Sequence, residues 1–566
     1  MKKSDFIFIL LGIIFILNSK TTIAQLLTQE QLVEDAKQMV DIIESCHPDP
    51  YINTNGKIGF HLSFYELLKS IPEEGMASED FWWLLSEFLA KIEDGHTYLY
   101  PLKQPDPNNP GGIPLHFKVL ADSTLVVSKI CNEEHESLIG CMMLTINNFE
   151  VSTLLKKVTS LYPMENLFDK YRNLNVYLWY ADYLKHLILG WEYGKPVEIE
   201  VQEKNLSIKK INIQTGEKTS YKTINTEKSS LTLPSVKKCD FVYDWIGPNK
   251  DVCYLRIEKQ DEFREYAEQA VSGLKSIQNE DMLKAYRQQY LIYAHQWHSR
   301  FHGTPGPDSL EQIISELPSF TEFMRDFVKK LKESQTENLV IDLSNNNGGV
   351  SLLSDILGYF LFGKEKLGEL HADSYDITFL SPMAINTASS LNTEELNKIR
   401  GIDQQFPLQP GDYDFYTLNK WEEKSSKIQN LPDSYFESTP TFLAEYITGN
   451  YSGYYCPKSI YVIGSDKTFS AGFETLVRLV KCGATFVGVP PAQSGNCFGM
   501  GIEPANGLTN SKIRFQVSVK KICTFPEDKE KGYQLNPDIP IDYKTFEKYK
   551  FDPNTSILTI LDRINS

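Results

Sequence analysis

The 566-residue sequence lacks several features that would assign a protein to a common class at once. It contains no basic block and no Lys/Arg stripe, and its formal net charge of −17 is spread along the chain. Nucleic acids and anionic membrane surfaces attract positively charged proteins, so this charge argues against both as partners. After the first two dozen residues, no run is long and apolar enough to predict a membrane-spanning helix.

Metal-binding and disulfide patterns are also missing. The nine cysteines are few for the length and odd in number, and no pair has CxxC spacing, which favours buried thiols over a disulfide framework. His295, His298 and His302 lie close together, but no glutamate completes a zincin pattern around them. We therefore expect surface histidines, no metal and no cofactor.

The N-terminus has the composition of an export signal. Lys2 and Lys3 precede an apolar run over residues 6–17, and Ala24 supplies a small residue at a cleavage position. We expect residues 1–24 to be a signal peptide and the mature protein to be periplasmic or secreted, with no membrane span after cleavage. An uncleaved signal anchor is the alternative.

The remaining chain divides by pattern into three parts. Apolar residues at helical spacing predict an N-terminal helical region over residues 25–105. Residues 106–245 predict a small strand-rich domain that ends in a polar linker, with no catalytic constellation of its own. Strands alternate with helices over residues 246–566, which predicts an α/β core. Two insertions without regular patterning, near 262–318 and 364–455, are expected to be lids or binding elements.

One hydroxyl lies where a serine can act as a nucleophile. Ser470 follows a buried strand over residues 459–463 and precedes apolar residues at helical spacing over residues 473–480. Free N–H groups and the positive end of the helix dipole favour a developing oxyanion at such a position. The alternative is that Ser470 only caps the helix, as serines often do.

A second turn has two glycines and would lie at the same edge of the sheet. Ser344-Asn345-Asn346-Asn347-Gly348-Gly349 follows a strand over residues 338–343, and α/β proteins bind ligands at the carboxyl ends of such strands. Gly348 or Gly349 could donate one oxyanion contact and the N–H of Ala471 another. The alternative is a tight turn that needs glycine for its backbone conformation.

These segments together carry a family resemblance. Asn-Leu-Val-Ile-Asp-Leu-Ser-Asn-Asn-Asn-Gly-Gly, then Thr-Phe-Ser-Ala-Gly-Phe-Glu, then Asn-Pro-Asp-Ile-Pro at 536–540, resemble the core of the tail-specific (C-terminal processing) serine peptidases. Glu-Asp-Gly-His-Thr at 93–97 resembles the branch that includes the tricorn core and the interphotoreceptor retinoid-binding proteins. The resemblance implies a ClpP/crotonase-like α/β core. The segment at 140–148 resembles a strand of a PDZ-like module.

The resemblance also implies which residues act, and one departure decides between two bases. Family members with a Ser-Lys pair carry a lysine about 25 residues after the nucleophile, but Gln493-Ser494-Gly495-Asn496 contains none. Lys481 lies about 16 Å along the helix from Ser470, too far to act. In the tricorn-like branch the base is a histidine oriented by a glutamate. His96 matches that histidine, and Glu530 is our choice for the glutamate, with Glu527 and Asp528 as alternatives.

The prediction is thus a serine endopeptidase that cleaves peptide or protein substrates through Ser470, His96 and an acidic residue near 530. A serine needs a base to become nucleophilic, and neutral imidazole titrates near working pH. A carboxylate behind the imidazole fixes its tautomer. Two alternatives stay open: a catalytically inactive protein on this fold that binds peptides or small ligands, and an esterase or amidase, although Ser470 lacks a Gly-x-Ser-x-Gly setting.

Overall fold

The computed structural model describes most of the chain. The described residues are 26–103, 106, 110–216, 229, 231–236, 239–247, 251–274, 280–387, 393–400, 406–423, 430–449, 455–504 and 507–566. The expected signal peptide lies outside them. Within the described part of the chain, no helix combines the length and apolar character that crossing a bilayer requires.

The N-terminal region is helical. Thr28 begins its first helix with a capping box, in which the side chains of Thr28 and Gln31 exchange hydrogen bonds with each other's backbone N–H groups. His47 and Pro48 end that helix, as the proline-punctuated sequence predicts. The elements are β1 (Leu26–Leu27), α2 (Gln29–Cys46), α3 (Gly56–Lys69), β2 (Met76–Ala77), α4 (Ser78–Ala90) and β3 (Tyr98–Leu99).

The second region is a small domain with a predominantly antiparallel sheet. The strands follow the order β4-β5-β6-β8-β9, with β7 paired to β6, and helices α5 to α7 pack beside them. The helical segment that follows α5 is divided at Tyr180, where the backbone is extended. The elements are β4 (Leu115–Val119), β5 (Leu125–Ile130), η1 (Glu133–Leu138), β6 (Met142–Ile146), β7 (Phe149–Glu150), α5 (Val151–Leu161), α6 (Leu167–Trp179), α7 (Ala181–Leu187), β8 (Val197–Gln202) and β9 (Ile208–Ile213).

The third region is built on a six-stranded sheet of order β10-β11-β12-β15-β16-β19. All neighbours are parallel except β10 and β11. β10 begins within the stretch expected to be a linker. The strands are β10 (Phe241–Ile246), β11 (Val252–Ile257), β12 (Asn338–Asp342), β15 (Ser459–Gly464), β16 (Thr485–Gly488) and β19 (Ile539–Pro540).

Alternating side chains of this sheet enter two different cores. Leu339 and Ile341 join a cluster with α8, α11, α12 and α17, whereas Val340 packs on the other face against Ile557 and Ile560 of α20. Period-two alternation on a sheet covered on both faces explains why these strands are apolar throughout. The helices are α8 (Arg264–Leu274), α11 (Phe320–Glu333), α12 (Leu352–Ala372), α17 (Ala471–Lys481), α19 (Tyr543–Lys548) and α20 (Thr555–Asn565).

Both insertions contain more regular structure than their sequences indicated. The first holds α8, α9 (Glu280–His302) and α10 (Leu310–Glu316). The second holds β13 (Tyr375–Phe379), α13 (Pro382–Thr387), α14 (Thr393–Arg400), β14 (Tyr413–Asp414), α15 (Tyr416–Glu422), η3 (Asp433–Phe436) and α16 (Pro440–Thr448). Tyr413 of the second insertion donates to the carbonyl of Pro48 at 2.6 Å, so this segment packs against the N-terminal region.

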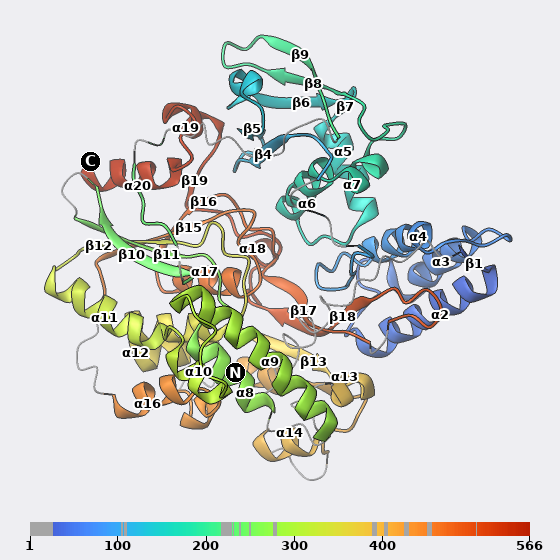
Figure 1. The fold of residues 1–566 in the computed structure, drawn as a ribbon. Helices are drawn as coiled ribbons and strands as arrows, with labels where there is room; N and C mark the ends of the chain where they lie inside the picture. The colour runs from blue at the N-terminus through green and yellow to red at the C-terminus, as the bar shows by residue number, and fades with distance from the viewer. Residues whose placement is uncertain are drawn as a thin grey trace.

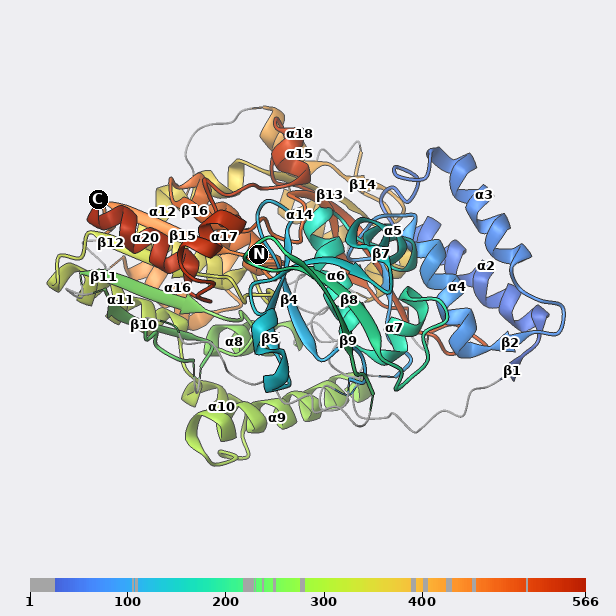
Figure 2. The ribbon, with the colours of Figure 1, turned by 90° about the horizontal axis from the view of Figure 1, so that it is seen from above.

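A second sheet joins the core to the N-terminal helices. Strands β17 (Asn496–Ile502) and β18 (Phe515–Cys523) form a hairpin, and β18 also pairs with β13 and β3. Figure 1 shows this hairpin running from the core, next to α18 (Lys529–Tyr533), toward α2 and α4, with the small domain above. Seen from above, the N-terminal helices lie at one end of the molecule and α20 at the other (Figure 2).

Candidate active site

The candidate nucleophile lies at the carboxyl edge of the six-stranded sheet. The strand expected over 459–463 and the helix expected over 473–480 are confirmed as β15 and α17. Ser470 precedes α17 with φ 53° and ψ −128°. A serine rarely adopts positive φ, so its surroundings must hold it there at an energetic cost. Its side chain makes no capping hydrogen bond, so the interpretation of Ser470 as an ordinary N-cap is wrong.

The turn after β12 holds the Ser470 turn in place. Asn346 is fully buried, its carbonyl accepts from the N–H of Phe469 at 3.1 Å, and its side chain donates to Ile257. Thr468 donates to the carbonyl of Leu343 at 2.8 Å. Two neighbouring parallel strands therefore deliver interlocked turns to one edge of the sheet.

Gly348 and Gly349, in the turn after β12, have different roles. A Cβ on Gly348 would lie 2.7 Å from Ser470 Cβ, so only glycine permits this close approach. The N–H of Gly348 donates to Asn346 Oδ1 at 2.9 Å and is therefore already used. Among the described residues, the N–H groups of Gly349 and Ala471 have no such partner. Of the three expected oxyanion donors, Gly349 and Ala471 remain candidates and Gly348 takes the role of a spacer.

The segment from 93 to 97 places His96 beside this turn. The His96 ring stacks on Phe469, the neighbour of Ser470, with ring centroids 5.4 Å apart and an interplanar angle of 22°. Asp94 accepts from the N–H of His96 at 2.9 Å, and Gln516 of β18 donates to the carbonyl of His96. The histidine is thus held at its backbone and on one ring face.

The carboxylate that faces His96 is Glu165, and this corrects the expectation of Glu530. His96 Nδ1 lies 3.2 Å from Glu165 Oε1, and these buried atoms have no other partner among the described residues. A Cβ on Gly95 would lie 2.9 Å from Glu165 Oε1, so the glycine of the Asp-Gly-His segment lets the carboxylate approach. Glu530 is exposed on α18, which directs it to solvent rather than to the imidazole.

Both alternatives to Glu530 also lie elsewhere. Glu527 is exposed, and Asp528 caps α18 by accepting from the N–H of Lys531 at 2.9 Å. The segment does reach the site through its backbone, because Ser494 Oγ donates to the carbonyl of Tyr533 at 2.8 Å. The expected spacing thus identified the right neighbourhood but not the right carboxylate.

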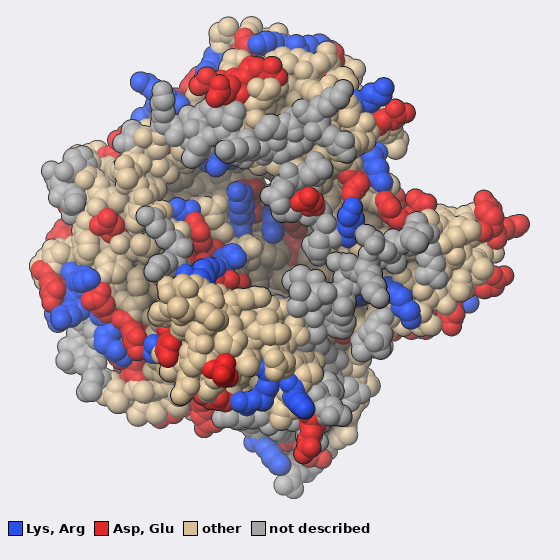
Figure 3. All heavy atoms as spheres, in the orientation of Figure 1, with Lys and Arg blue, Asp and Glu red and all other residues tan. Residues whose placement is uncertain are grey.

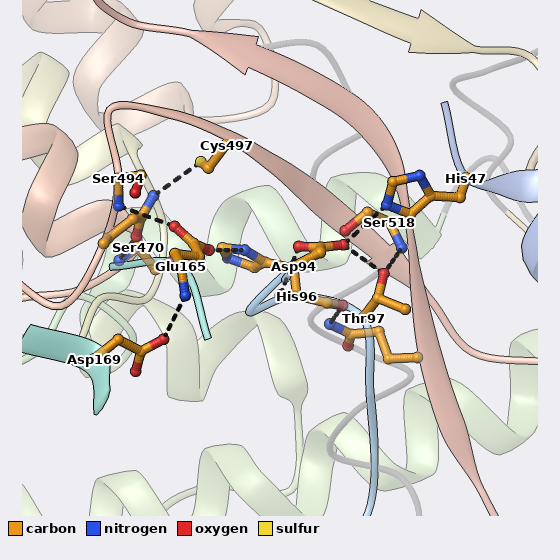
Figure 4. A network of polar contacts seen from close by, with 12 residues as sticks. His47, Asp94, His96, Thr97, Glu165, Asp169, Ser470, Ser494, Cys497 and Ser518 are labelled. Carbon is orange, nitrogen blue, oxygen red and sulfur yellow. Dashed lines mark hydrogen bonds and ion pairs between the residues drawn. The ribbon is translucent and has the colours of Figure 1, made fainter. Parts of the chain in front are cut away.

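Glu165 comes from the small domain, where the sequence indicated no catalytic group. It follows Pro163 and Met164 just before α6, a position that the sequence marks only as the introduction to a helix. Its other oxygen, Oε2, accepts from the N–H of Ser494 at 2.9 Å. In Figure 4 Glu165 faces His96 on one side, and Ser470, Ser494 and Asp169 lie on its other side in that view.

Gln493 lies in the segment where the Ser-Lys pattern has its lysine, and it contacts the Ser470 turn. Gln493 Oε1 accepts a short hydrogen bond from the N–H of Ser470, and Gln493 Nε2 lies 3.6 Å from the thiol sulfur of Cys497. Sequence reasoning noted this segment only for the lysine that it lacks. The amide occupies space beside the nucleophile and ties the Ser470 turn to the loop that holds Glu165.

Charges around the imidazole shift its protonation. Burial disfavours the imidazolium, but Glu165 and then Asp94 outweigh it, so the pKa of His96 is raised. Asp94 is buried, yet hydrogen bonds from His47 and Thr97 hold its pKa at about 2. Burial raises the pKa of Glu165 against the effect of His96. The site therefore combines the anionic Asp94 carboxylate, the His96 imidazole and the Glu165 carboxylate.

The histidines of the first insertion make structural contacts. His298 Nδ1 lies 2.7 Å from the carbonyl of Thr304 and its Nε2 lies 2.7 Å from Glu316. His302 faces the carbonyl of Glu316, and His295 that of Pro305. These contacts tie the end of α9 to α10. No cysteine among the described residues forms a disulfide, and six are buried: Cys46, Cys131, Cys141, Cys253, Cys497 and Cys523.

Comparisons with known proteins bear on the fold. No protein-family model matches the chain, and no curated protein matches it. Its fold is similar to that of mature CPAF complexed with lactacystin, with a TM-score of 0.53, 12% identity and 94% of this chain covering 99% of that one. A second structure of mature CPAF gives a TM-score of 0.52 at 11% identity, with 95% and 96% of the two chains covered.

These structural neighbours are serine peptidases of the S41 family. The chain therefore shares their fold over nearly its whole length. At 12% identity the likeness establishes the fold alone. The activity has to be argued from the residues of this chain.

Proposed function

We propose that this protein is a serine peptidase in which Ser470 attacks the scissile carbonyl, His96 takes the serine proton and Glu165 stabilises the resulting imidazolium. The observation that carries the proposal is the strained Ser470 turn. A positive φ at a non-glycine residue, supported by the hydrogen bond between Phe469 and the buried Asn346, costs free energy that an ordinary helix start would not require.

The surrounding groups fit the steps of acyl transfer. The N–H groups of Ala471, at the start of α17, and of Gly349 are suited to an oxyanion. Because Glu165 faces Nδ1 of His96, the proton from Ser470 would be taken by Nε2. The same imidazolium then returns that proton to the leaving amine, and a water molecule releases the acyl group by the reverse path. The catalytic hydrogen bonds of such sites often tighten only when substrate binds.

The test uses one probe and one library. Wild type should react with a fluorophosphonate at Ser470 and cleave members of a peptide library, whereas Ser470→Ala should do neither, with turnover reduced about 10³-fold or more. Ser459→Ala, at the start of β15, is the matched control and should keep both activities. Labelling without any peptide cleavage would favour an esterase or amidase. Neither labelling nor cleavage would favour the inactive binding protein.

The finer fold assignments belong to the same proposal. The parallel strands of the core support a ClpP/crotonase-like core of the tricorn-like branch, and the antiparallel sheet with α5 supports a PDZ-like small domain. A PDZ-like module binds an extended peptide as an added strand at the edge of its sheet. A crystal structure of Ser470→Ala with a substrate peptide should show that strand, and a peptide bound without sheet pairing would contradict this part.

We also propose that the protein acts outside the cytoplasm, as a periplasmic or secreted enzyme. The basic and apolar composition of residues 1–24 supports export. N-terminal sequencing of the protein recovered from cells should begin at Gln25. A mature chain that retains residues 1–24 would contradict cleavage.

A further inference from the structure

Arg172 and the candidate base His96 both contact the ring of Phe469. The Arg172 guanidinium carbon lies 4.9 Å from the centre of the Phe469 ring, and the same ring stacks on His96. Arg172 belongs to α6, which is capped by Asn166, and the Asn166 side chain also donates to the carbonyl of Pro491. Helix α6 is thereby fixed to the loop that carries Gln493. A helix fixed at its N-terminus therefore places the guanidinium over the ring of Phe469, the residue before Ser470.

Arg172 has no carboxylate partner among the described residues. By contrast, the core pairs Arg325 with Glu445, Arg478 with Asp355 and Arg514 with Glu503. A half-buried guanidinium without an anion is costly, because its charge is partly removed from water. Its cation–π contact with Phe469 uses no N–H donor of the guanidinium in a hydrogen bond, so these donors can bind a carboxylate.

No carboxylate of the described residues forms an ion pair with Arg172, although its charge acts on Asp169 and Asp466. Asp169, one turn earlier on α6, accepts from the N–H of Glu165 at 3.1 Å and from Asn173 at 2.9 Å. Burial raises the pKa of Asp169 to about 7 although Arg172 opposes this, so at neutral pH it carries only part of a negative charge. Glu165 faces His96 and Ser494. Neither group acts as a full counter-ion.

The wider surroundings of the nucleophile turn also contain positive charge. Lys467, Arg172 and Lys118 all act on the buried Asp466, whose pKa is nevertheless raised by burial. The charges of three cations thus act on one buried carboxylate. Figure 3 shows Lys and Arg side chains, together with Asp and Glu side chains, on the walls of a hollow in the middle of this face, over the position that α6, α17 and α18 occupy in Figure 1.

We propose that Arg172 is a specificity-determining residue that binds the side-chain carboxylate of an aspartate or glutamate in the peptide substrate, close to the scissile bond. The assignment rests on the proposed peptidase function of the same site. A guanidinium binds a carboxylate through two parallel hydrogen bonds, and contact with the Phe469 ring restricts where the Arg172 guanidinium lies. The substrate class is thus acidic peptides.

The experiment compares matched peptides. Fluorogenic peptides with amidated C-termini carry either glutamate or glutamine at each position within about three residues of the cleaved bond. At one position wild type should prefer glutamate by about 10-fold to 100-fold in kcat/KM, and Arg172→Gln should abolish that ratio while the glutamine peptide is cleaved within about threefold of wild type. Arg172→Lys should keep part of the ratio, because it keeps the charge but loses the planar fork. Lys185→Gln is the control and should keep the whole ratio. Lys185 is an exposed cation on neighbouring α7 that pairs with Glu79.

Several outcomes would overturn the inference while leaving the peptidase intact. Equal rates for glutamate and glutamine at every position would do so. Equal loss of both substrates in Arg172→Gln, with an unchanged melting temperature, would assign Arg172 to holding Phe469 and His96 instead. A preference that appears only when the C-terminus is free would assign the cation to the terminal carboxylate.

Binding separates this inference from the proposed function. Ser470→Ala should bind the glutamate peptide about 10-fold more tightly than the glutamine peptide, measured by fluorescence anisotropy, whether or not wild type hydrolyses either. Wild type that cleaves nothing but shows this difference fails as a peptidase and keeps the acidic binding site. Equal dissociation constants would overturn the site itself.

Discussion

Two partly buried histidine–carboxylate pairs in this molecule have opposite protonation behaviour. His96 lies 3.2 Å from Glu165, and His371 lies 2.7 Å from Asp355 within α12. Burial lowers the pKa of both imidazoles, yet the pKa of His96 is raised overall and that of His371 is lowered. A carboxylate partner alone therefore does not determine whether the pKa of a histidine is raised or lowered.

A third charge accounts for the difference. Asp355 also pairs with Arg478, whose positive charge opposes protonation of His371. His96 instead has Asp94 as a second anion, and that carboxylate is held by His47 and Thr97. Buried histidine–carboxylate pairs are thus either structural or poised for proton transfer according to the next charge. The following experiments test that comparison, from the largest expected effect to the smallest.

Removal of the imidazole at the first pair should have the largest effect. His96→Ala should reduce kcat/KM for a cleavable peptide by about 10³-fold or more, because the Ser470 hydroxyl loses its proton acceptor. The measurement is steady-state hydrolysis, with circular dichroism to check the fold. Near-normal turnover in a folded variant would remove His96 from the mechanism.

Neutralising the first carboxylate should reduce activity less and move its pH dependence. His96 must be neutral to accept a proton, so activity rises with pH through its pKa. Loss of the Glu165 charge removes the main group that raises that pKa. Glu165→Gln should therefore lower kcat/KM by about 100-fold. It should also move the acid limb of the pH profile, the range over which kcat/KM rises with pH, to lower pH.

The control for that experiment is the carboxylate that the sequence favoured. Glu530→Gln removes an exposed charge on α18, and its pH profile of kcat/KM should coincide with that of wild type. A limb that moves in Glu530→Gln and stays fixed in Glu165→Gln would reverse the assignment.

The second anion should contribute a smaller part of the same shift. Asp94→Asn keeps a hydrogen-bonding side chain but removes the charge, so the acid limb should move to lower pH by less than in Glu165→Gln, with about a 10-fold loss of kcat/KM. Thr97→Val is the control, since it removes one hydrogen bond to Asp94 and leaves the charge. An acid limb that stays in place in Asp94→Asn would mean that Asp94 only supports the backbone of His96.

Asp94 also predicts a pH-dependent stability. Its pKa in the folded protein, about 2, lies below its ordinary value of 3.8. This carboxylate therefore stabilises the fold above pH 4, by about 2 kcal/mol, and the contribution is lost as the pH falls toward 2. Urea unfolding of wild type and Asp94→Asn should give a difference that disappears in that window.

The sequence predicted the parts of the site that depend on local pattern. Ser470 follows from a buried strand and an amphipathic helix, and the glycines at 348 and 349 follow from a strand that ends in a turn. Both signals are local and were sufficient to place two turns at one edge of a sheet. The position of His96 came from a family resemblance, since a histidine beside a glycine has no pattern of its own.

The carboxylate could not be found in this way. Glu165 reaches His96 only because the small domain packs against the core through contacts such as that between Asn166 and Pro491. No periodicity encodes a contact between segments 325 residues apart. Gly95 offered a weak signal, because its missing Cβ leaves room for that carboxylate. The regular helices of the first insertion were missed because α9 has apolar and polar residues on most of its faces.

The smallest effect on catalysis is expected at the second pair. His371→Gln should leave kcat/KM within about twofold of wild type and leave the acid limb in place, because His371 contacts Asp355 and Arg478 lies beyond it, and neither contact involves the nucleophile.

The effect of His371→Gln should appear in stability instead. The pKa of His371 is lower in the folded protein than its ordinary value, so below about pH 6.5 the unfolded chain binds the extra proton and the fold loses stability as the pH falls. His371→Gln should therefore remove part of the decline in unfolding free energy between pH 7.5 and pH 5, a difference of about 1 kcal/mol or less, measured by urea unfolding at both values. For His96 the sign is reversed, because a raised pKa contributes stability at low pH that is lost as the pH rises through it. A 10-fold loss of activity in His371→Gln, or a decline in stability identical to that of wild type, would show that the third charge does not separate the two pairs.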